Sequence, residues 1–238
     1  MKALQIEFIK LFRPSTYVIL AILLLVVFIR GEFGMHLVSP DLTGMLKSTD
    51  AGMADMIGFI FSIFVIMNIG QEYTENTLRR SIIEGYTRGK FFIGKLLLVI
   101  VAAVLLLLVQ KLIFLALAAS AGYTKEAFDC LTVSGAVYSL IRTILYALLG
   151  FFLIFLTRSV AISIIISFVW TSVEGLLSIY LKFKYPGSDW GSYLPFSSLA
   201  QILATDGTIA FQFVFIALGY QVALVAGSYG LLATRDIK

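Results

Sequence analysis

The chain has 238 residues, of which 60% are hydrophobic and only 13% charged, and its mean hydropathy is +0.97. A soluble globular domain carries about 25% charged residues, because its surface needs polar side chains to cover it. This composition excludes a soluble domain and predicts a membrane protein. Since each membrane helix uses about 20 residues, the length allows about five to seven spans and leaves no room for a separate soluble catalytic domain.

Two residue counts exclude whole classes of site. The single cysteine, Cys130, excludes an intramolecular disulfide, and the single histidine, His36, excludes any site that needs two histidines. We also expect no metal site and no cofactor in this chain.

Long apolar runs predict an all-α, polytopic membrane protein with a single transmembrane domain over residues 1–238. Helices are the default in hydrocarbon because they satisfy their own backbone, and residues 96–108 show none of the alternation that a β-barrel requires. The predicted spans are 16–37, 53–70, 91–119, 134–156, 159–180 and 209–233.

Lys and Arg are divided unequally between the two sides of these six spans. Of the 18, eleven fall on the side of the termini, five on the other side and two inside spans. The positive-inside rule therefore predicts cytoplasmic termini and outward segments at 38–52 and 181–208. The basic N-terminus resembles a secretory signal, but residues 29–33 offer no small-residue cleavage site. We expect an uncleaved first span and a cell-membrane location.

The N-terminal segment 1–14 is amphipathic, with apolar side chains three and four residues apart and basic ones between them. Pro14 ends this pattern before the first span. The segment predicts a helix lying in the inner headgroup plane. The alternative is a plain extension of the first span.

The segment 71–95, between the second and third spans, holds eight charged residues. Helix propensity runs through 74–84, and Gly85 is a natural C-terminal cap. Apolar side chains four residues apart lie beside two arginines; these residues are Leu78, Ile82, Arg79 and Arg80. The pattern predicts a short amphipathic helix that binds a soluble partner. The alternative is a solvated loop whose charges only fix the topology.

The order of interfacial helix, span, outward loop, span and charged segment resembles the permease subunit of type-2 ABC exporters. The resemblance is carried by Glu72, Thr77, Leu78, Arg79, Gly85, Arg88, Gly94 and Lys95. Asn76 stands where family members usually have glycine. The resemblance implies that 71–90 holds the coupling helix, which binds in a cleft of the ATPase subunit. The implied coupling residues are Glu72, Thr77, Leu78, Arg79, Arg80, Ile82, Gly85 and Arg88.

The resemblance also implies partners: an ATPase subunit that binds ATP and magnesium, and a second permease copy or a homologous permease. It further implies short helices dipping into the outer leaflet within 181–208. The nearest approach to a P-loop, residues 85–91, has three intervening residues where four are needed and Phe91 where Ser or Thr must bind magnesium. We therefore expect no enzymatic activity in this chain. We also expect it to contact membrane lipid and not nucleic acid.

Three of the charged residues inside predicted spans lie far from the predicted cytoplasmic ends. Counted at 1.5 Å per residue, Lys111, Arg142 and Glu174 fall in the outer part of the bilayer. Buried charges there are costly unless paired, so Glu174 is expected to pair with Arg142 or Lys111. For Lys111 the alternative is snorkelling to the outer headgroups.

The fifth span carries small residues spaced four apart. These form one ridge, made of Ser159, Ser163, Ser167, Thr171 and Gly175. Such ridges allow close helix approach. The ridge predicts a dimer seam or the wall of a substrate path, and the alternative is packing within one subunit.

These features together predict an ATP-driven exporter of an amphipathic or hydrophobic substrate. An ion-coupled secondary transporter would need midplane carboxylates and usually an inverted repeat, and a passive membrane assembly protein is the other alternative. An intramembrane enzyme is disfavoured because His36 lies at the outer end of the first span.

Overall fold

The computed structural model describes residues 14–35, 41–74, 87–185, 190–204 and 211–234. These residues form α-helices and one short 3-10 helix, η1, with no strand among them. The elements in chain order are α2 (Pro14–Met35), α3 (Leu42–Thr74), α5 (Arg88–Ser120), α6 (Thr124–Cys130), α7 (Val133–Thr157), α8 (Val160–Lys184), η1 (Trp190–Tyr193), α9 (Pro195–Ala204) and α10 (Phe211–Thr234).

Five of the described helices are long and apolar enough to cross a membrane, namely α3, α5, α7, α8 and α10. They correspond to the second to sixth predicted spans. The helix α2 covers the first predicted span but is not among the five, so the sixth crossing stays a prediction. The predicted interfacial helix over 1–14 lies almost entirely outside the described residues.

Two helices are longer than predicted. Both α3 and α5 have 33 residues, which is about 50 Å of helix against a hydrocarbon core of about 30 Å. Residues 42–52 of the predicted outward segment are helical, because they form the first turns of α3; that they face outward stays a prediction. Within the predicted outer segment 181–208, η1 and α9 are short helices.

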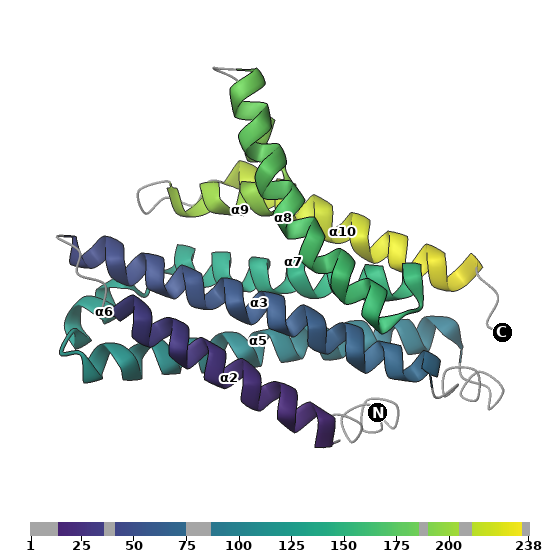
Figure 1. Cartoon of the computed structure of the whole chain (residues 1–238), viewed down its shortest axis with the longest axis horizontal. Helices are drawn as coiled ribbons and strands as arrows, with labels where there is room; N and C mark the ends of the chain where they lie inside the picture. Colours follow the sequence, from purple (N-terminus) through teal and green to yellow (C-terminus); the bar gives the residue numbers. More distant parts are fainter. Residues whose placement is uncertain (1–13, 36–40, 75–86, 186–189, 205–210, 235–238) are drawn as a thin grey trace.

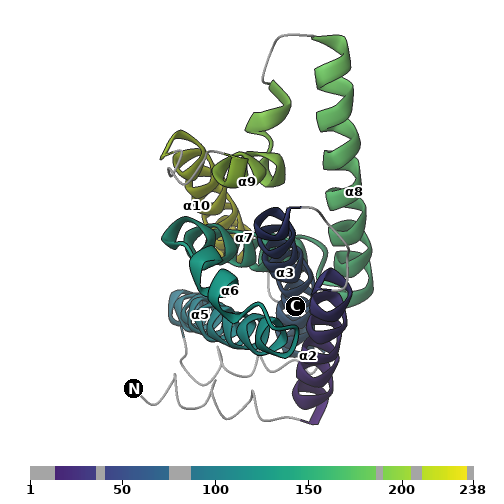
Figure 2. The ribbon, with the colours of Figure 1, turned by 90° about the vertical axis from the view of Figure 1, so that its left-hand side faces the viewer.

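The helices α2, α3, α5 and α7 pack around one apolar core (Figure 1). A smaller apolar cluster joins α7 to α9 and α10. The beginnings of α2 and α5 lie at the same end of the molecule as the ends of α3, α7 and α10 (Figure 1). Figure 2 shows α8 standing away from this bundle over its later turns.

Close packing of α3 against α7 depends on glycine. A Cβ placed on Gly150 of α7 would lie 2.8 Å from the backbone oxygen of Ser62 on α3. Gly58 of α3 similarly receives the ring of Tyr146, since a Cβ there would lie 2.6 Å from Cδ2. Small residues at such crossings are how membrane helices approach closely without a hydrophobic driving force between them.

Candidate functional site

All three acidic residues of α3 are ion-paired with bases on the helices that pack against it. Asp50 pairs with Lys111 of α5, Asp55 with Arg142 of α7, and Glu72 with Lys95 of α5. Two of these pairs lie toward the beginning of α3 and one toward its end. Because a charge inside a membrane protein is costly unless paired, these contacts fix the register of α3 against α5 and α7.

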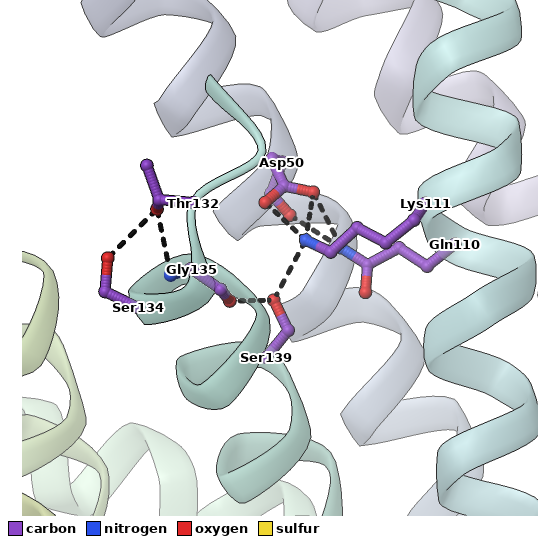
Figure 3. A network of polar contacts seen from close by, with 7 residues as sticks. All are labelled: Asp50, Gln110, Lys111, Thr132, Ser134, Gly135 and Ser139. Carbon is purple, nitrogen blue, oxygen red and sulfur yellow. Dashed lines mark hydrogen bonds and ion pairs between the residues drawn. The ribbon is translucent and has the colours of Figure 1, made fainter. Parts of the chain in front are cut away.

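Lys111 is held by a network rather than reaching freely for solvent (Figure 3). Its Nζ donates to both carboxylate oxygens of Asp50, at 2.7 and 2.6 Å, and to the Ser139 hydroxyl at 3.4 Å. The buried amide of Gln110 donates to the backbone oxygen of Asp50 at 3.0 Å and to its Oδ1 at 3.1 Å. Snorkelling alone is therefore the wrong interpretation of Lys111.

Arg142 finds its partners on α3 and on its own helix. Its guanidinium pairs with Asp55 and donates to the hydroxyl of Tyr138, and it also lies 5.3 Å from the centre of the Tyr138 ring. The partner of Arg142 is therefore Asp55 and not the predicted Glu174.

Glu174 binds the N-terminus of α9 instead of a base. Its Oε1 accepts hydrogen bonds from the backbone N–H groups of Phe196, at 2.5 Å, and Ser197, at 3.0 Å. These N–H groups belong to the first turn of α9, where a helix leaves donors without intrahelical acceptors and favours negative charge. The predicted pairing of Glu174 with Arg142 or Lys111 is wrong, and the buried carboxylate instead fastens α9 to α8.

A second polar centre lies at the other end of α3, next to the predicted coupling segment. Lys95 is 1% exposed; its Nζ lies 3.3 Å from Glu72 Oε1 and donates to Asn68 Oδ1 at 3.1 Å. The lysine also lies above the ring of Phe91, at 5.8 Å from its centre. Glu72, predicted as a coupling residue, therefore points into the bundle rather than outward.

Arg88 ties the start of α5 to the end of α10. Its Nη1 donates to the backbone oxygens of Leu232 and Ala233, at 3.0 and 2.9 Å. A cation at the last carbonyls of a helix is favourably placed. The remaining predicted coupling residues, Thr77, Leu78, Arg79, Arg80, Ile82 and Gly85, lie outside the described residues.

The small-residue ridge of α8 is divided. Ser163 and Ser167 are fully buried; Ser167 lies 3.5 Å from the hydroxyl of Ser62 on α3, and Ser163 lies 2.6 Å from that of Thr157. These two serines therefore pack within one subunit. Gly175 is exposed, and a Cβ placed there would meet no atom within 4 Å.

The sequence interpretation missed Asp55 and the buried role of Lys95. Asp55 lies inside the predicted span 53–70, and a carboxylate in a span is itself the signal of a buried partner. Lys95 falls five residues into the third predicted span. Its distance of 23 residues from Glu72 gives no indication, from sequence alone, that the two meet.

The arrangement is a helical membrane unit with buried ion pairs at both ends. Comparison with curated proteins finds no match. The profile of the ABC-2 family transporter proteins, in contrast, matches residues 3–174, which is most of the chain and includes α2, α3, α5 and α7. The chain belongs to the ABC-2 family of transporter proteins.

Proposed function

We propose that this chain is the permease subunit of an ATP-driven exporter that moves an amphipathic or hydrophobic substrate outward. A separate ATPase subunit would bind the segment between α3 and α5 and hydrolyse ATP. Membership of the ABC-2 family and five apolar helices of spanning length support this assignment.

The proposal rests mainly on polar contacts that join the residues on both sides of this segment to neighbouring helices. Before it, Glu72 of α3 is paired with Lys95 of α5. After it, Arg88 of α5 is bonded to the last turn of α10. A displacement of the segment would therefore move α3, α5 and α10 together instead of bending a loose loop.

Closure of the ATPase subunits on nucleotide would act through this connection. A partner can shift an equilibrium between two permease conformations only by binding one of them better. The permease itself then needs no reactive group. All three carboxylates of α3 are ion-paired, an arrangement that favours a structural role for them over ion coupling.

We also propose that the complex contains two permeases that meet along α8. The later turns of α8 stand away from the bundle (Figure 2) and carry large exposed apolar side chains, including Leu176 and Phe183. The end of α3 and the start of α5 adjoin the basic residues 79, 80, 88 and 90, and they lie at the same end of the molecule as the start of α2 and the end of α10 (Figure 1). Because basic residues favour the cytoplasmic side, both termini would be cytoplasmic.

Co-purification tests the proposal. With a tag on this chain alone, an ATPase subunit should co-purify from its native membrane. The double change Arg79→Glu and Arg80→Glu should abolish that association. The matched control, Lys182→Glu with Lys184→Glu at the far end of α8, should leave it intact. Absence of any ATPase from the unmodified preparation would contradict the proposal.

A further inference from the structure

A groove of about 640 Å³ runs between α5, α7 and α10, and its position is separate from the ion pairs and from the α8 ridge. Its walls are apolar and include Leu96 of α5, Leu148 of α7 and Ala226 of α10. The amide of Gln221, which also lines it, donates to the backbone oxygen of Ile141 at 2.9 Å. The volume falls in the range of about 300–1,000 Å³ typical of ligand sites, and the walls suit a hydrocarbon ligand.

The groove has the length of one leaflet. Along α5 it is lined from Gly89 to Ile100, which is about 16 Å at 1.5 Å per residue. The hydrocarbon core of a bilayer is about 30 Å thick. The groove therefore begins at the first turn of α5 and extends for about the thickness of one leaflet.

Positive charge gathers at the end of the groove that lies at the start of α5. Gly89, the first lining residue, stands between Arg88 and the exposed Lys90. The guanidinium of Arg88 is fixed at this end because it bonds the last turn of α10. The N-terminus of α5 adds its partial positive charge. The site thus combines an apolar channel with a cationic mouth.

We propose that the groove binds an anionic phospholipid from the cytoplasmic leaflet, with one acyl chain between α5 and α10 and the headgroup beside Arg88 and Lys90. The leaflet follows from the proposed cytoplasmic position of the start of α5. The lipid is a bound component of the permease. Its acyl chain would lie between α5 and α10, next to the contact that Arg88 makes with the last turn of α10.

A photoactivatable phosphatidylglycerol, with the diazirine in its acyl chain, tests this in the intact complex reconstituted in vesicles. Crosslinks located by peptide mass spectrometry should concentrate on the lining residues of α5, α7 and α10. The change Ala226→Trp fills the groove and should lower this labelling at least about tenfold. The matched control is Ala223→Trp, an exposed alanine on the same helix that does not line the groove, and it should leave labelling unchanged.

Two further arms test the headgroup and the leaflet. The same diazirine in phosphatidylcholine should label the groove about tenfold less, and Lys90→Gln should reduce the difference between the two lipids. Equal labelling by the two lipids would overturn the anionic assignment. Crosslinks spread evenly over the exposed face of α8, or unchanged in Ala226→Trp, would overturn the site. Labelling only by probe placed in the outer leaflet would overturn its orientation.

Discussion

Replacing Glu72 by glutamine should strongly destabilise the protein, because it leaves Lys95 buried without its carboxylate. The two charges lie 3.3 Å apart, and at an effective dielectric constant of about 20 their attraction is about 5 kcal/mol. Removing one partner of a buried pair costs about 3–5 kcal/mol. Since the Asn68 oxygen still accepts from Lys95, we expect the lower end, about 3 kcal/mol.

The assay is thermal unfolding of the purified complex, followed by loss of its monodisperse peak. For a chain of this size about 3 kcal/mol corresponds to a fall in Tm of roughly 6–12 °C. The double variant Glu72→Gln with Lys95→Gln removes both charges and should recover most of that loss. The matched control, Lys125→Gln, changes an exposed lysine of α6 and should alter stability by less than about 0.5 kcal/mol.

The melting temperatures of these variants together show whether Glu72 and Lys95 form a stabilising buried pair. A Glu72→Gln variant that melts with the unmodified protein would refute the idea that the pair is a buried fastening. Strict additivity in the double variant would refute direct coupling of the two charges. In the complex, Glu72→Gln should also retain ATP hydrolysis while losing much of its dependence on substrate.

Three further predictions concern other parts of the fold. Glu174→Ala removes the acceptor for two N–H groups of α9 and should lower the free energy of unfolding by about 1–3 kcal/mol. Glu174→Gln keeps an accepting oxygen and should lower it less. Hydrogen exchange of the α9 amides measures both effects, and unchanged protection in the alanine variant would contradict the contact. Gly150→Ala should destabilise by about 1–3 kcal/mol because the new methyl group meets the backbone of Ser62, while Gly230→Ala, with open space around it, should be neutral or stabilising in the same melt. Burial raises the pKa of the Cys130 thiol above its ordinary value. A membrane-impermeant maleimide should therefore label this thiol slowly at neutral pH and faster as the pH rises past the ordinary pKa of a thiol. Labelling only from the cytoplasmic side would contradict the proposed topology.

Hydropathy was sufficient to predict α7, α8 and α10, whose observed bounds lie within a few residues of the predicted spans. It placed the start of α3 about ten residues too late, because Lys47, Ser48 and Asp50 lower the local average. A helical signal is present there: Met45, Leu46 and Thr49 are buried at helical spacing. Side-chain periodicity therefore carried information that the hydropathy average concealed.

The pairing of charges could not be predicted in the same way. Asp50 and Lys111 are 61 residues apart, and only the packing of α3 on α5 brings them together. Glu174 found backbone donors rather than a base, because α9 folds back with its first turn beside α8. The sequence does predict that each intramembrane charge needs a partner, but the choice of partner depends on contacts between distant helices.

We propose above all that an ATPase subunit binds the segment between α3 and α5. The most direct measurement is crosslinking from Leu78→Cys, in a Cys130→Ser background, to the ATPase that co-purifies with the complex. A single crosslinked product should form, and its yield should change when a non-hydrolysable nucleotide is added. Lys182→Cys, at the far end of α8, should give none. Absence of the Leu78→Cys product in every nucleotide state, with the ATPase present, would contradict the account.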